Sequence, residues 1–203
     1  MYIPKLYCEE DRAKIFEFLK QNEFATLVTY DGEKPTASHL LFEVTEMGAG
    51  LFLNGHMSRA NPLWKTFEMN PEVLVIFQGP HTYISPTWYN HVNVPTWNYQ
   101  AVHVYGSPRI VNDSDEVRAM LTHLIVRNEG NPAYRLETLP QDFVEKETRG
   151  IVAFQVAVTR IEANYKLSQN RDAEDYHNII ERLDEREDGM SHAVAEAMRR
   201  QRI

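Results

Sequence analysis

The segment Gly55–Pro62 (GHMSRANP) combines residue types that bind phosphate. Ser58 offers a hydroxyl, Arg59 offers a guanidinium group, and we expect a helix to begin at Asn61-Pro62, where Asn can cap and Pro suits the first turn. A helix N-terminus favours anions, and Arg makes paired, charge-assisted bonds to phosphate oxygens. The segment alone is also compatible with a solvated Arg59 and an Asn61 that only caps the helix.

A second polar segment, Lys166–Arg171 (KLSQNR), carries five hydrogen-bonding side chains between an expected strand and an expected helix. Lys166 and Arg171 add two positive charges there. Such a cluster can hold the edge of a flavin ring, a phosphate or a partner subunit, and an ordinary polar turn is the alternative.

The segment His81–Gly106 contains no Asp, Glu, Lys or Arg, and the uncharged run extends from Val73 to Pro108. It holds two of the three tryptophans, four tyrosines and three of the eight histidines. Pro, Asn, His and Thr interrupt it too often for a membrane span. It therefore indicates either a buried interface or ligand wall, or a pair of aromatic core strands.

Motifs of common enzyme and metal sites are missing. There is no HExxH, CxxC, GxGxxG or GxxxxGKS pattern, and the single cysteine, Cys8, lies in a terminal segment. His81, His91 and His103 could meet in space, but they lack tight metal-ligand spacing. We therefore predict no catalytic residues and no metal site.

Composition places the chain among globular proteins. It has 203 residues, 43% of them hydrophobic and 25% charged, and a net charge of −8, which disfavours binding of nucleic acid through the surface as a whole. A single cysteine favours a reducing compartment, the start MYIPKLYCEEDR lacks the features of a signal peptide, and no segment resembles a membrane span. We expect a cytoplasmic protein with no membrane contact.

Hydrophobic periodicity predicts a mainly β protein with helices. Strands are expected at 25–30, 35–45, 49–54, 73–77, 82–85, 99–111 and 150–163. Helices are expected at 9–22, at 61–69 after a loop at 55–61, at 113–128 with Asp113 as the cap, at 141–147, from an Asp172 cap onward, and from a Ser191 cap to the end. Hairpins outnumber strand–helix alternations, which favours an antiparallel β-barrel with helical additions. We divide the chain into a barrel domain, 1–165, and a C-terminal helical extension, 166–203.

The last two helices superficially resemble a helix-turn-helix. The first of them is rich in Asp and Glu, and a positive stripe is confined to Arg199, Arg200 and Arg202. Phosphate contact requires several cations on one face, so we favour a packing or dimerisation role for this pair over direct DNA reading.

Several long motifs in sequence order together resemble the PaiB family of FMN-binding negative transcriptional regulators. They are MYIPKLY (1–7), TASHLLF (36–42), GHMSRANP (55–62), GPHTYISPTWY (79–89), VPTWNYQAVHVYG (94–106) and KLSQNR (166–171). The resemblance covers nearly the whole chain. It implies an FMN-binding split β-barrel, related to the pyridoxamine phosphate oxidases, that binds FMN between the subunits of a homodimer.

The resemblance also implies a set of FMN-binding residues, with the strand of TASHLLF along the isoalloxazine and Ser58-Arg59 near the phosphate. The set is Ser38, His39, Leu40, Asn54, His56, Ser58, Arg59, Asn61, Trp97, Lys166, Ser168, Gln169, Asn170 and Arg171. Two departures matter. Ala60 stands where the oxidases usually have Lys, so Lys166 or Arg171 would replace that cation, and Leu41 stands where many relatives have Pro.

The expected function is negative regulation of sporulation and degradative-enzyme (protease) genes, with DNA or a transcriptional partner protein as the target. A flavin-dependent oxidoreductase and a haem-binding split barrel are the alternatives. A neutral aromatic wall suits a flavin or a two-fold interface, so we place Trp88, Tyr89, Trp97 and Tyr99 at the dimer interface beside the flavin.

Overall fold

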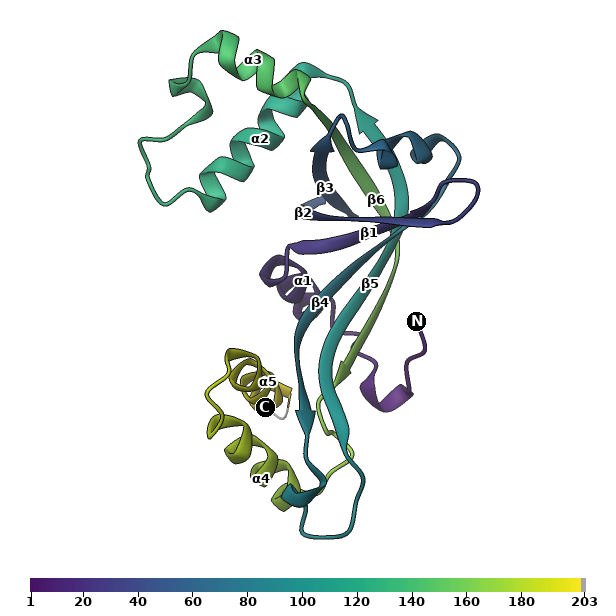
Figure 1. Ribbon diagram of the computed structural model, residues 1–203, viewed down its shortest axis with the longest axis vertical. Coiled ribbons are helices and arrows are strands. Elements are labelled where there is room, and N and C mark those ends of the chain that lie inside the picture. Colours follow the sequence, from purple (N-terminus) through teal and green to yellow (C-terminus); the bar gives the residue numbers. More distant parts are fainter. Residues whose placement is uncertain (202–203) are drawn as a thin grey trace. The chain divides into compact units, whose positions relative to one another are not determined.

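A computed structural model describes residues 1–201 and contains six strands that close into an antiparallel barrel (Figure 1). The order around the barrel is β1-β2-β3-β6-β5-β4. The strands are β1 (Phe24–Tyr30), β2 (Pro35–Met47), β3 (Gly50–Ser58), β4 (Val73–Ile84), β5 (Thr96–Val111) and β6 (Ile151–Lys166). The predicted antiparallel split barrel with C-terminal helices is thereby confirmed.

Five α-helices and four short 3₁₀ helices accompany the strands. The α-helices are α1 (Arg12–Gln21), α2 (Ser114–Asn128), α3 (Gln141–Arg149), α4 (Ala173–Asp184) and α5 (Gly189–Gln201). The 3₁₀ helices are η1 (Lys5–Tyr7), η2 (Pro62–Glu68), η3 (Pro86–Trp88) and η4 (Leu136–Thr138). None of the helices described in residues 1–201 is both long and apolar enough to span a membrane.

The chain forms two compact units. Unit 1 comprises Met1–Asn22, Phe77–His103 and Glu162–Ile203, of which residues up to 201 are described, and unit 2 comprises Glu23–Ile76 and Val104–Ile161. Our division at residues 165/166 stays a prediction, because compactness alone does not show which segment folds independently. The two units are considered separately below.

Alternating side chains build the core of unit 2. Successive strand residues point to opposite faces of a sheet, and those of one face meet inside the barrel. The ring of Phe154 packs there edge-on against Phe42 and Phe67, with centroids 5.9 and 5.3 Å apart. A Cβ on Gly55 would lie 2.8 Å from the Phe154 ring, so glycine makes this packing possible.

In unit 1, α4 and α5 form a helical hairpin (Figure 1). Asp172 caps α4 as predicted, and Tyr176, Ile179 and Leu183 are buried. The Tyr176 hydroxyl donates to the carbonyl of Met198 at 2.6 Å and so ties α4 to α5. The two helices thus pack on each other, and our preference for a packing or dimerisation role over DNA reading stays a prediction.

Several predicted boundaries were wrong. GHMS was expected to be a loop, but β3 continues to Ser58 because it pairs with β6 along its whole end. Gly79-Pro80 was expected to split two strands, but β4 is continuous. Among the described residues β1 pairs with β4 only at 74–76, so Pro80 lies where no β1 partner needs its missing N–H.

The helix expected at 61–69 is a 3₁₀ helix, although Asn61 does cap it by accepting from Leu63 N at 3.1 Å. Helix α5 begins at Gly189 rather than after a Ser191 cap, and the Ser191 N–H donates to Asp188 instead. The positive stripe is reduced: Arg199 pairs with Asp184, the Arg200 Nε lies 3.2 Å from Glu196, and Arg202 lies outside the described residues.

Candidate functional site

The predicted triplet Ser38, His39 and Leu40 lies on β2, where alternation sends neighbouring side chains to opposite faces. Ser38 and Leu40 pair with inward-facing residues of β1, whereas His39 is opposite Thr26 on the outer face. The Thr26 hydroxyl lies 2.9 Å from His39 Nδ1, and Phe24 stacks on the imidazole with centroids 6.2 Å apart. His39 and Phe24 therefore form an exposed aromatic pair on the outer surface.

Asn54 and His56 also lie on the outer face, on β3, but α2 covers them. The Asn54 amide donates to Thr45 at 3.1 Å and accepts from Gln155 at 2.8 Å. Burial lowers the pKa of His56, so its ring is neutral at neutral pH. The space left beside α2 is about 20 Å³, far below the ~300 Å³ and more of sites that hold small organic ligands.

Arg59 follows the end of β3, and the loop between α3 and β6 holds its guanidinium. Its Nε donates to the carbonyl of Arg149 at 2.8 Å and its Nη2 to that of Ile151 at 2.7 Å. Asn61 donates to the Ser38 hydroxyl at 2.9 Å, and the Ser58 hydroxyl accepts from Ala60 N at 3.3 Å. One edge of the Arg59 guanidinium is thus fixed by backbone carbonyls.

A pocket of about 300 Å³ adjoins Arg59 in unit 2. Its wall also includes Trp64, Arg149, Ser114 and residues at the start of β6. None of its described lining residues is a carboxylate. Two guanidinium groups beside hydroxyl groups suit a dianionic phosphate. The sequence analysis did not predict Arg149 as a site residue. Its signal was indirect: Ala60 stands where the oxidases usually have Lys, so a second cation near Arg59 has to come from elsewhere in the chain.

The remaining predicted residues lie in unit 1, where Lys166–Arg171 forms a tight turn. Ser168 has φ of 61° and is 3% exposed, and its hydroxyl exchanges hydrogen bonds of 2.9 and 3.1 Å with the Asn98 amide. Gln169 accepts from Leu167 N at 2.7 Å and donates to the carbonyl of Tyr165. Ser168 and Gln169 therefore shape the turn, and Asn170 is exposed.

Lys166 and Arg171 bring two cations to this turn. Lys166 donates to the Thr96 hydroxyl, and the pKa of its amine is lowered, first by burial and then by the charge of Arg171. The Arg171 guanidinium lies 4.4 Å from the centroid of Tyr89. An anion bound between the two cations would relieve their repulsion.

The aromatic residues expected at an interface have different surroundings within unit 1. Trp97 is 52% exposed and its ring lies 6.1 Å from His81, whereas Tyr89 is 8% exposed. Tyr99 accepts a hydrogen bond from Asn164 at 3.0 Å, and Arg186 lies 4.7 Å from the Trp88 centroid. Trp97 is thus available to a ligand or a second subunit, and Tyr89 belongs to the core of its unit.

Two groups of predicted site residues result, one in each unit. In unit 2 guanidinium and hydroxyl groups line one pocket, and in unit 1 the cations Lys166 and Arg171 lie in one turn. In the described part of the chain, no group of three or more His, Cys, Asp and Glu is arranged to hold a metal ion.

Comparison with known proteins gives a family match over most of the chain. The family described as "Putative FMN-binding domain" matches residues 1–160. "Protease synthase and sporulation protein PAI 2" of Bacillus subtilis is 42% identical over 201 residues, covering 98% of this chain and 96% of the relative. An uncharacterised protein of Emericella nidulans is 26% identical over 225 residues, covering 89% of each chain.

Solved structures share the fold at low sequence identity. The FAD and haem binding protein from Mycobacterium smegmatis is 15% identical with a TM-score of 0.60, covering 84% of this chain and 78% of its own. The flavocytochrome Anf3 from Azotobacter vinelandii is also 15% identical, with a TM-score of 0.59 and coverage of 87% and 78%. At this identity the likeness supports the split-barrel fold alone.

Proposed function

Because this chain belongs to the PaiB family of FMN-binding domains, we propose that it is an FMN-binding negative regulator of transcription that acts in the cytoplasm on sporulation and protease genes. The observation that carries the proposal is the 42% identity to PAI 2 over 98% of the chain. Bound FMN supplies a planar ring that can take up electrons, which would couple regulation to redox state or flavin supply.

In this proposal Arg59 is the main phosphate ligand in unit 2. Its guanidinium is held by the carbonyls of residues 149 and 151, so little side-chain entropy is lost when it binds. Arg149 and Ser58 add donors near it. In this proposal Arg149 replaces, within the same unit, the cation that is missing at Ala60.

The isoalloxazine ring would rest near His39 and Phe24 on the open part of the β2 face. Stacking on these exposed rings adds contact area without a competing charge. Asn54 and His56 are less accessible, since α2 covers them. We propose that they support the β2–β3 surface rather than contact the ring directly.

We further propose that two copies of the chain share each cofactor, one contributing Arg59 and the other the Lys166–Arg171 turn with Trp97. The support is the exposed indole of Trp97 within a segment free of charged residues. An uncharged, aromatic surface is typical of the centre of a protein interface.

The first experiment measures FMN affinity of the flavin-free protein by fluorescence quenching. Arg59→Gln should weaken binding about 10- to 100-fold, the value of one charge-assisted bond to phosphate. Arg59→Lys should lose less, because it keeps the charge. Arg118→Gln, which removes an exposed cation of α2 outside the pocket, is the control. Unchanged affinity in Arg59→Gln would remove Arg59 from the phosphate site.

The second experiment tests sharing between copies. Arg59→Gln and Lys166→Gln proteins are mixed, exchanged and titrated with FMN. If each site takes one residue from each copy, a mixed dimer has one intact site and one doubly altered site, so tight binding returns to half the sites of that dimer. If both residues of a site come from one chain, mixing restores no tight site.

Regulation is tested by a gel shift at physiological salt with promoter fragments of sporulation and protease genes. A shift would support direct DNA contact, whereas repression in cells without a shift would indicate a partner protein. If the protein causes no gel shift and its removal causes no change in transcription, the proposed regulatory function is refuted. A Soret band in the purified protein, in place of flavin absorbance, would favour a haem-binding barrel.

A further inference from the structure

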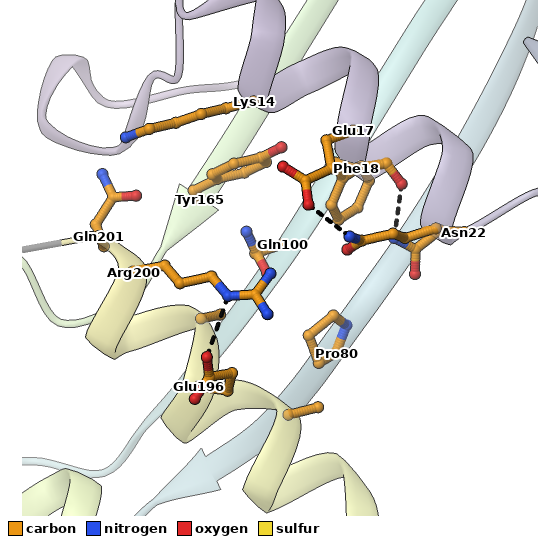
Figure 2. A pocket seen from close by; sticks show the side chains of 13 residues that line it. Lys14, Glu17, Phe18, Asn22, Pro80, Gln100, Tyr165, Glu196, Arg200 and Gln201 are labelled. Carbon is orange, nitrogen blue, oxygen red and sulfur yellow. Dashed lines mark hydrogen bonds and ion pairs between the residues drawn. The ribbon is translucent and has the colours of Figure 1, made fainter. Parts of the chain in front are cut away.

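Unit 1 contains a pocket of about 460 Å³ that none of the candidate FMN residues lines (Figure 2). Helix α1, the unit 1 portions of β4, β5 and β6, and helix α5 form its walls. This volume lies within the range of sites that hold small organic ligands. The pocket is therefore large enough for a ligand of more than one ring.

Two aromatic side chains, inclined to each other by 44°, form the apolar wall of the pocket. The rings of Phe18 and Tyr165 lie 5.4 Å apart. Phe18 packs so closely on β4 that a Cβ on Gly79 would lie 2.4 Å from its ring. Ala193 and Ala197, four residues apart on α5, add small side chains to the pocket wall and leave space in front of these rings.

The hydroxyl of Tyr165 has no hydrogen-bond partner among the described residues, although the side chain is only 4% exposed. Burial, with Glu9 and Glu17 nearby, raises its pKa, so the phenol keeps its proton and remains a donor. Buried polar groups usually have a partner. A ligand acceptor inside the pocket would supply one.

Two cationic side chains, Arg200 and Lys14, line the pocket together with two carboxylates, Glu17 and Glu196. The Glu17 carboxylate accepts from Gln21 at 2.8 Å, and Glu196 lies near both Arg199 and Arg200. Each of the two acids that line the pocket therefore accepts a hydrogen bond, although the partner of Glu17 is a neutral amide and leaves its charge in place. Arg200 contacts Glu196 through Nε, and Lys14 is half-exposed with its amine 3.8 Å from Glu9. Figure 2 shows Arg200 and Lys14 on either side of Tyr165 in that view.

We propose that this pocket binds an aromatic carboxylate with at least two fused rings and a second acceptor at the far end. The rings lie against Phe18 and Tyr165, and the carboxylate receives charge-assisted hydrogen bonds from Arg200 and Lys14. The acceptor at the far end of the ligand accepts a hydrogen bond from the Tyr165 hydroxyl. Such a ligand is an effector of the protein that binds independently of FMN.

Calorimetric titration of the whole protein tests this, with 2-naphthoate, 6-hydroxy-2-naphthoate and 2-naphthamide as probes. The acids should bind at least 10-fold more tightly than the amide. Ala197→Phe should fill the pocket and abolish binding. Arg200→Gln should weaken binding of the acids about 10-fold, whereas Arg182→Gln, which removes an exposed cation of α4 outside the pocket, should leave it unchanged.

Tyr165→Phe separates ligand binding from folding. It removes only an unpartnered hydroxyl, so the melting temperature should not fall, while the advantage of 6-hydroxy-2-naphthoate over 2-naphthoate should disappear. Three results would overturn the proposal: no binding of either acid at millimolar concentration, equal binding of acid and amide, or full affinity in Ala197→Phe. Displacement of 6-hydroxy-2-naphthoate by FMN would also overturn it, because the pocket would then belong to the flavin site.

Discussion

Among the glycines of unit 2, Gly106 is the one where adding a methyl group should destabilise the fold most. A Cβ there would lie 2.4 Å from the carbonyl oxygen of Ala157 and 2.6 Å from a methyl of Val156. Contacts this short force a shift, and the oxygen belongs to the backbone of the neighbouring strand β6. Gly106→Ala must therefore move β5 and β6 apart.

Such overpacking typically costs about 1–3 kcal/mol, and backbone contact favours the upper end. Replacing a strand glycine by alanine returns ~0.5–1 kcal/mol of conformational entropy. The net loss in the free energy of unfolding should be ~2 kcal/mol. At about 2–4 °C per kcal/mol, the melting temperature should fall by roughly 4–8 °C.

Urea unfolding followed by circular dichroism measures this loss directly. Gly130→Ala is the matched control, since a Cβ there would meet no atom within 4 Å and its φ is not positive. The control should be neutral or stabilising by up to about 1 kcal/mol. If Gly106→Ala keeps the wild-type midpoint and slope, the close approach of β5 to β6 is refuted.

Three further predictions concern the two units. The free energy of unfolding should fall as the pH drops below about 6.5, because His56 takes up a proton in the unfolded chain, whereas burial disfavours its protonation in the folded protein. His56→Gln should reduce this loss in urea titrations at pH 5 and 7. An unchanged dependence on pH in the variant would contradict the prediction. Asp175→Ala should lower the free energy of unfolding by ~1–3 kcal/mol more than Asp175→Asn in the same assay, because only Asn keeps an oxygen that accepts from the Asn90 N–H, a bond of 2.8 Å. Equal losses in the two variants would show that this hydrogen bond does not stabilise the protein. Ser168→Gly should be tolerated better than Ser168→Val in thermal melts, because φ of 61° strains a β-branched residue; the reverse order would exclude the left-handed conformation.

The sequence predicted the elements better than their continuity. The caps at Asp113 and Asp172 are local side-chain to backbone bonds, and both were found where expected. The strand through GHMS depends on pairing with β6, almost a hundred residues away, so local turn residues were misleading. The same holds for Gly79-Pro80, where the neighbouring strands decide whether the chain turns.

The candidate site shows a similar division. Alternation along β2 already separates His39 from Ser38 and Leu40, and that signal was present in the sequence. Helix α2 lies over Asn54 and His56 because of tertiary packing, which the spacing of residues along the sequence does not predict. Arg149 joins Arg59 only because the end of α3 meets the end of β3.

The three long strands have a consequence for limited proteolysis of this protein. The borders between the two units fall at 22/23, 76/77, 103/104 and 161/162, and the last three lie inside β4, β5 and β6. Neither unit is one continuous stretch of sequence, so a single cut cannot separate one from the other. A protease will find no linker at these three borders whose cleavage releases a folded half.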